Sequence, residues 1–309
     1  MKKIWQYLRE HVQEDFRLAE YTSIAIFLAI CIALNYTFDF EDSFLDLQTG
    51  FSKFLYYLLT HAVAYLIPVL LIRFLSGKSL KLTSEFWLRS SLLLTLISFD
   101  RSNFLLEQWV YDFFHHQASF LAYKVLNNLS GLIYIILPLF LFYMLRDKHE
   151  HNFYGLSKNV PDVKPYFILL LIMLPILVAA SFLPGFQKQY PMYASTLAHT
   201  YLHVPEWVTV TMYETAYALN FVSIEFLYRG FLVIGMATVL GRSAILPMAS
   251  LYCFLHFGKP MPEAISSIFG GYILGVIALQ TRSIWGGILV HVGIAWMMEA
   301  IAYLQKLFN

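Results

Sequence analysis

The sequence predicts an all-α membrane protein, a polytopic bundle of about eight or nine transmembrane helices. Of its 309 residues, 59% are hydrophobic and 13% are charged, against about 45–50% and about 25% in soluble domains. So few charges cannot cover a soluble globule of this size, and disorder requires the opposite composition. The net charge of +1 provides no basic field, so we expect no nucleic-acid partner.

The predicted helices follow from apolar runs close to the roughly 20 residues that cross a bilayer. Residues 1–20 carry charges of both signs, which is atypical of a signal peptide, and they are expected to form a cytoplasmic amphipathic segment. An interfacial helix is expected around Trp109–Phe120. The expected spans are Tyr21–Phe38, Phe54–Ile72, Phe86–Phe99, Leu129–Leu145, Pro165–Pro184, Trp207–Leu240, Ser243–Phe257, Pro262–Thr281 and Ile284–Leu304.

The distribution of charged residues predicts the topology. Lys and Arg favour the cytoplasmic side of a membrane, and they occur in the loops at residues 73–81 and 146–164, which include Lys78 and Lys158. The acidic loop at residues 39–46 is then external. We therefore expect an integral protein of the plasma or inner membrane, with a cytoplasmic N-terminus and with membrane lipid as a partner.

The spans divide into two groups by their polar residues. Residues 21–164 contain ordinary apolar spans, whereas residues 165–309 hold nearly all the ionisable residues expected at membrane depth. We treat both groups as parts of one continuous membrane domain. An ionisable side chain inside a bilayer costs about 2.5–3.5 kcal/mol on insertion scales, so each is a candidate for function unless it is paired.

Glu225 and Arg229 are the first such residues, and their spacing of four places them on one helix face. One interpretation is a buried ion pair with no further role. The other is a carboxylate that Arg229 keeps ionised, ready to act as a general base or to orient one.

Two histidines and two further glutamates follow. His256 ends an apolar run, with Glu263 close behind it near the start of the next helix. His291 lies in the last span, after two glycines that allow helices to approach closely, and Glu299 follows eight residues later on roughly the same face. For His256 a structural hydrogen bond is the competing interpretation, and for Glu263 an ordinary charge at a helix N-terminus.

Several other chemistries lack their motifs in this sequence. No His-Glu-x-x-His zinc-protease helix is present, and no phosphate-binding glycine loop. No Gly-x-Ser-x-Gly nucleophile turn is present either. A small-solute transporter would have a similar composition, but the chain lacks a pair of broken helices in matching halves.

The order of these motifs resembles the CAAX-protease and bacteriocin-processing family (CPBP, also called Abi), which includes the type II CAAX prenyl endopeptidases. The resemblance covers about Trp207–Leu304. The family's Glu-Glu-x-x-x-Arg motif corresponds to Ile224–Gly230, its Phe-x-x-x-His motif to Tyr252–His256, and its His-x-x-x-Asn motif to His291–Ala295. The first glutamate is replaced by Ile224 and the asparagine by Ala295.

The resemblance implies an intramembrane endopeptidase that cleaves membrane-associated or lipidated peptide or protein substrates. Its implied site has Glu225 and His256 activating water, His291 stabilising the oxyanion and Arg229 holding Glu225. Glu225 could take the place of the missing glutamate only if the helix is rotated by about 100°, one residue of an α-helix. Glu263 and Glu299 are candidates for supporting residues.

Two questions stay open at the level of the sequence. Glu225, His256 and His291 are a set of the kind that binds zinc, whereas the glutamate–histidine mechanism needs no metal. Because Ile224 and Ala295 remove two functional side chains, a catalytically inactive membrane scaffold or immunity-type binding protein is the alternative to the protease.

Overall fold

A computed structural model describes residues 2–75, 80–149, 152–156 and 162–308. This part of the chain is helical and contains no β-strand. Its first ten elements, of which η1, η2 and η3 are π-helical, are α1 (Lys2–Asp15), α2 (Leu18–Phe38), η1 (Glu41–Leu45), α3 (Gly50–Leu75), α4 (Ser84–Ser102), α5 (Phe104–Phe113), α6 (His116–Gly131), η2 (Leu132–Ile136), α7 (Leu137–Phe142) and η3 (Tyr143–Asp147).

The second half of the chain adds ten further helical elements. One of them, η4, is a long π-helical segment, and η5 is a 3₁₀ turn. These elements are α8 (Lys164–Ala180), α9 (Pro184–Gln189), α10 (Ala198–Tyr201), α11 (Glu206–Glu225), η4 (Phe226–Gly235), α12 (Ala237–Leu240), η5 (Gly241–Ala244), α13 (Ile245–Phe254), α14 (Met261–Thr281) and α15 (Trp285–Phe308).

The all-α membrane bundle predicted from the sequence is confirmed. Among the described residues, six helical stretches are long and apolar enough to cross a membrane, at 18–38, 50–75, 116–147, 206–254, 261–281 and 285–307. α8 is apolar but shorter. The expected count of eight or nine spans stays a prediction, as does the division of the chain at residue 164. Lys78 and Lys158 lie outside the described residues.

The predicted interfacial helix around Trp109–Phe120 is wrong, because the chain turns in the middle of that range. α5 ends at Phe113, and Phe114 has an extended backbone. The imidazole of His115 then accepts a hydrogen bond from the backbone N–H of Gln117 and so caps the start of α6. The first backbone N–H groups of a helix have no partner within that helix. A side-chain cap at His115 therefore marks the start of a new helix, not the interior of a continuous one.

Helix α2 shows how an apolar span serves two environments. Three of its side chains face the core, at 3–9% exposure: Ile24, Leu28 and Ile32. Its opposite face is equally apolar but exposed, with Ile26, Ile30 and Leu34 pointing outward. A soluble helix would carry polar residues on that face, so the exposed apolar stripe is the surface expected to contact lipid.

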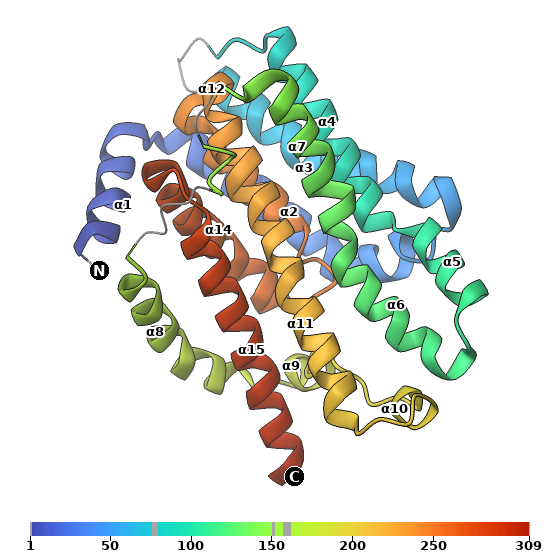
Figure 1. Cartoon of the computed structure of the whole chain (residues 1–309). Coiled ribbons are helices and arrows are strands. Elements are labelled where there is room, and N and C mark those ends of the chain that lie inside the picture. Colours follow the sequence, from blue (N-terminus) through green and yellow to red (C-terminus); the bar gives the residue numbers. More distant parts are fainter. Residues whose placement is uncertain (1, 76–79, 150–151, 157–161, 309) are drawn as a thin grey trace.

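The centre of the bundle is η4, in which all ten residues are buried. α13 and α14 pack against it, and α13 packs in turn on α3. Figure 1 shows α11, α14 and α15 running side by side in the second half of the chain, with α8 at one edge and α6 at the other. Gly230 and Gly235 of η4 leave room for Tyr154, since a Cβ at either position would lie 2.7–3.2 Å from that residue.

Two ion-pair networks fasten the first half of the chain to this centre. In the first, Arg89 of α4 makes two 2.7 Å hydrogen bonds to the Asp147 carboxylate, which also accepts one from the Tyr154 hydroxyl. Because Tyr154 packs on Phe226 and Phe231 of η4, this network ties α4 to the buried π-helical segment.

The second network holds the turn between α13 and α14. Asn35 donates a 3.1 Å hydrogen bond to the carbonyl of Phe257, and the Tyr36 hydroxyl donates one of 2.7 Å to the carbonyl of Lys259. The neighbouring Glu41 forms an ion pair with Arg101 beside the same turn. α2 and η1 therefore fix the backbone around His256.

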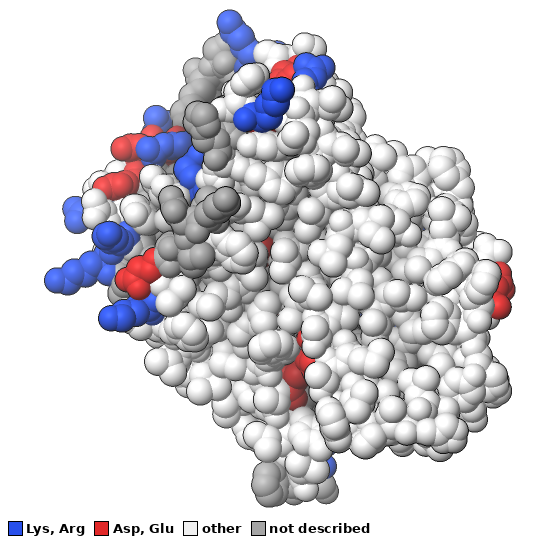
Figure 2. All heavy atoms as spheres, viewed as in Figure 1, with Lys and Arg blue, Asp and Glu red and all other residues white. Residues whose placement is uncertain are grey.

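The charged surface is uneven. Figure 2 shows Lys and Arg gathered at the end of the molecule that holds the N-terminus and α12, while most of the same face carries no charge. This pattern suits an integral membrane protein, and a concentration of Lys and Arg at one end is what a cytoplasmic side requires. The cytoplasmic orientation of the N-terminus stays a prediction.

Replacement of Arg89 by Met is expected to destabilise the protein by about 3–5 kcal/mol, because it leaves the Asp147 carboxylate buried without its cation. Unfolding can be followed in detergent by thiol labelling of Cys253, which is fully buried, in a Cys31→Ala background. Arg146→Met is the matched control: Arg146 is 57% exposed and 3.9 Å from Glu85, so a change below about 1 kcal/mol is expected. Equal stability of the two variants would show that the buried network does not hold the fold.

Candidate functional site

The Glu225 carboxylate is the centre of the candidate site. It lies at the last residue of α11 and is completely buried. Its Oε1 atom is 2.6 Å from Nδ1 of His291 and 3.1 Å from Nη1 of Arg229. The expected pairing of Glu225 with Arg229 is therefore present, and His291 completes a three-residue group. A buried carboxylate is tolerated because it is paired and hydrogen-bonded.

Arg229 is positioned by η4 and is 1% exposed. Its guanidinium lies over the ring of Tyr252, with Cζ 4.2 Å from the ring centroid. None of its three nitrogens makes a hydrogen bond within the described chain, and Oε2 of Glu225 is likewise buried without a hydrogen-bond partner there. The charge of Arg229 is thus balanced by one carboxylate and one aromatic face, with donors left for a further group.

The glycines at the start of α15 bring His291 to Glu225. A Cβ on Gly287 would collide with the Glu225 carboxylate, and one on Gly286 would collide with the ring of Tyr166 on α8. The close helix approach expected from this glycine pair is confirmed. The His291 ring stacks on Phe221 of α11 at a centroid distance of 5.1 Å, which fixes the plane of the imidazole.

His256 lies in the turn after α13, with its ring 4.7 Å from the ring of Tyr252. Its Nδ1 is 2.9 Å from the carbonyl oxygen of Tyr252. A carbonyl only accepts, so Nδ1 carries the proton and the lone pair lies on Nε2. His256 is half-buried. Among the described residues, no hydrogen bond or ion pair joins it to Glu225.

Tyr252 connects the two histidines. Its hydroxyl forms a short hydrogen bond with Nε2 of His291, and its ring lies 4.7 Å from the His256 ring and 5.8 Å from the His291 ring. In the sequence, Tyr252 stands out only as the first residue of the second motif. The signal that could have found it is the aromatic replacement in the second motif, where a tyrosine adds a hydroxyl to the ring.

Glu263 and Glu299 make their contacts with the segment that follows α9. Glu263 accepts a 3.0 Å hydrogen bond from the Tyr190 hydroxyl, and Glu299 accepts one of 2.7 Å from the backbone N–H of Met192. Glu299 also lies beside Glu214 of α11. These two glutamates therefore hold a loop in place, and their supporting role in the site stays a prediction.

The two positions that depart from the motifs carry apolar side chains. Ile224 is half-buried and packs against the central hydrophobic cluster, and Ala295 is 4% exposed on α15. Neither can donate or accept a proton. The chemistry must come from the side chains already described.

The proposed zinc set of Glu225, His256 and His291 is not supported. Among the described residues, no three His, Cys, Asp or Glu side chains are grouped so that they could hold a metal ion. The donor atoms are also in use, because Nδ1 of His291 bonds Glu225 and Nε2 bonds Tyr252. We therefore derive no step through a metal.

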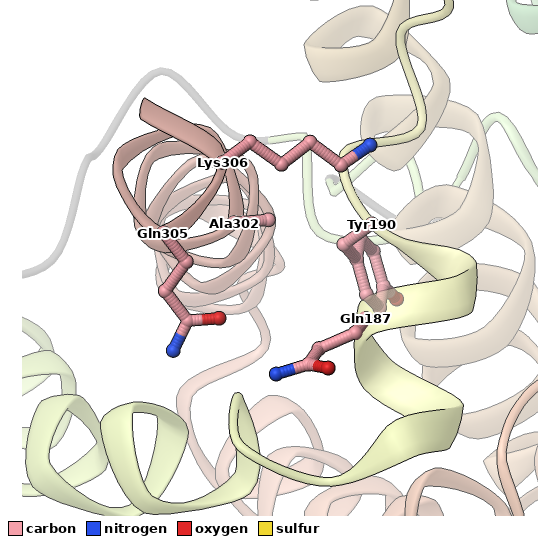
Figure 3. Close-up of a pocket in the computed structure, with 5 residues that line it drawn as sticks. All are labelled: Gln187, Tyr190, Ala302, Gln305 and Lys306. Atoms are coloured by element: carbon pink, nitrogen blue, oxygen red, sulfur yellow. The ribbon is translucent and has the colours of Figure 1, made fainter. Parts of the chain in front are cut away.

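The pocket drawn in Figure 3 lies elsewhere in the molecule. It measures about 210 Å³ and lies between α9 and the C-terminal end of α15, lined by Gln187, Tyr190, Ala302, Gln305 and Lys306. Gln305 is fourteen residues beyond His291, or about 21 Å along a helix. The pocket is consequently separate from the Glu225 group.

Comparison with known families identifies the segment that holds this site. Residues 205–297 match the family model of type II CAAX prenyl endopeptidase Rce1-like proteins. The resemblance predicted from the sequence is confirmed over these residues. The match includes Glu225, Arg229, Tyr252, His256 and His291, and the first 204 residues lie outside it. No curated protein and no solved structure matches the chain.

Gly287→Ala is expected to destabilise the protein by about 1–3 kcal/mol, because the added methyl group must displace the Glu225 carboxylate or the whole of α15. Thermal unfolding in detergent measures the effect. Gly270→Ala provides the control, since Gly270 lies in α14 with nothing within 4 Å of an added Cβ. If both variants unfold at the temperature of the unaltered protein, the close contact between α15 and Glu225 is not present in solution.

Proposed function

We propose that this protein is an intramembrane endopeptidase that cleaves membrane-bound or lipidated peptide substrates by attack of an activated water. The observation that carries the proposal is the buried group of Glu225, Arg229 and His291, linked to His256 through Tyr252, all within the segment that matches the CAAX prenyl endopeptidase model. A prenylated peptide is the substrate class that this match favours.

His256 is the general base of the proposed reaction. Its Nδ1–H is held by the Tyr252 carbonyl, so the basic Nε2 is free to take a proton from water. The same proton is then returned to the leaving amine. The hydrogen bonds from Asn35 and Tyr36 to the flanking carbonyls keep this imidazole in place.

Glu225 acts through His291 in this proposal. A carboxylate at 2.6 Å from Nδ1 fixes the tautomer of the imidazole and stabilises positive charge on it. Arg229 keeps that carboxylate ionised. His291 then stabilises the negative charge that develops in the tetrahedral intermediate, which is the role of an oxyanion hole.

The first test uses the full chain in liposomes and a farnesylated, internally quenched CAAX peptide. His256→Ala is expected to lower the cleavage rate by about 10²-fold or more, because the general base is lost. His199→Ala is the matched control: its Nδ1 also bonds a backbone carbonyl, that of Thr196 at 2.8 Å, but it lies in the short helix α10, outside the site. The control should cleave at the unaltered rate.

Two outcomes would contradict the proposal. Equal cleavage by His256→Ala and the unaltered protein would remove His256 from the mechanism. A folded, unaltered protein that cleaves neither the farnesylated peptide nor its unprenylated counterpart would favour the non-catalytic alternative, which the side chains of Ile224 and Ala295 also favour.

A further inference from the structure

The hydroxyl of Tyr252 occupies a position that the proposed mechanism has not used. It is hydrogen-bonded to Nε2 of His291, and the Glu225 carboxylate is hydrogen-bonded to Nδ1 of the same ring. The order carboxylate, imidazole, hydroxyl is the order of a catalytic triad, in which the carboxylate orients the imidazole and the imidazole exchanges a proton with the hydroxyl.

One cation lies against the ring that carries this hydroxyl. The Arg229 guanidinium covers the ring face at 4.2 Å, and a cation at this position stabilises negative charge on the phenol oxygen. The phenolic O–H can rotate about its C–O bond, away from Nε2 of His291. The phenolic O–H is then directed away from His291 and is free to donate to another acceptor.

We propose that Tyr252 donates a hydrogen bond to the oxyanion of the tetrahedral intermediate. The inference rests on the proposed function. The His256 ring packs edge-on against the Tyr252 ring at 4.7 Å, so the proposed base and the proposed donor lie side by side. Ala295, the position where the resembling family has an amide, offers a methyl group and cannot make this hydrogen bond.

The proposed step balances without any further reactant. The oxygen of water forms a bond to the carbonyl carbon while its proton passes to Nε2 of His256. The carbonyl oxygen becomes negative and accepts hydrogen bonds from the Tyr252 O–H. When the C–N bond breaks, His256 returns its proton to the leaving nitrogen, and the products are a carboxylic acid and an amine.

The test compares Tyr252→Phe with Tyr228→Phe. Tyr228 is the matched control because it is equally buried and packs on the Tyr252 ring at 5.0 Å, but its hydroxyl has no hydrogen-bond partner within the described chain. Cleavage of the farnesylated peptide by liposome-reconstituted protein gives kcat and KM. Binding of a farnesylated peptide difluoroketone, whose hydrate mimics the tetrahedral intermediate, gives an independent measure.

Tyr252→Phe is expected to lower kcat by about 10²- to 10³-fold, the usual effect of removing one oxyanion donor, with KM within about twofold of the unaltered value. Affinity for the difluoroketone should fall by the same factor as kcat. Tyr228→Phe should leave all three quantities unchanged, and both variants should unfold at the temperature of the unaltered protein.

Three results would overturn the inference alone, because the unaltered protein still cleaves in each. These are an unchanged kcat in Tyr252→Phe, an equal loss in Tyr228→Phe, and a rise of KM with no loss of kcat or difluoroketone affinity. Absence of cleavage by the unaltered protein, with no binding of the difluoroketone, would overturn the proposed function and this inference together.

Discussion

The arrangement depends on one buried negative charge. An isolated carboxylate in an apolar interior is strongly unfavourable, and Glu225 is fully buried, so every group around it is constrained to compensate. Arg229 supplies the counter-charge, His291 supplies a donor, and Gly287 removes the side chain that would stand in the way. The close packing of α15 on α11 follows from this requirement.

Residues in the first half of the chain hold the elements that carry the site in position. Asn35 and Tyr36 hold the backbone around His256, and the Arg89–Asp147 pair seats Tyr154 against the π-helical segment that follows Glu225. Although the family match begins at residue 205, the residues before it determine how two of the matched motifs are held. Such contacts explain why apolar spans with few polar groups keep a buried Asn and a buried Arg.

The fold could be predicted from local properties of the sequence, namely the length and apolarity of its segments. The site could be predicted only in part, because its contacts join residues that are far apart in the chain. The span predicted at Tyr21–Phe38 agrees with α2 within a few residues, since length and apolarity are read directly from the chain. The contact of Glu225 with His291 joins residues 66 positions apart, so the motifs indicated the two residues but not their partnership. The role of Tyr252 was not predicted, because an aromatic residue in an apolar run is typical of a hydrophobic core. Only the structure shows that its hydroxyl contacts His291.

The π-helical segment η4 has a further consequence for how the motif is compared between proteins. A π-helix holds more residues in each turn than an α-helix, so it shifts the facing of side chains on its two sides relative to one another. Glu225 is the last residue of α11 and Arg229 lies in η4, so the facing of one relative to the other depends on where the π-helical segment begins. The start of that segment is therefore part of the motif, in addition to the identity and spacing of its residues.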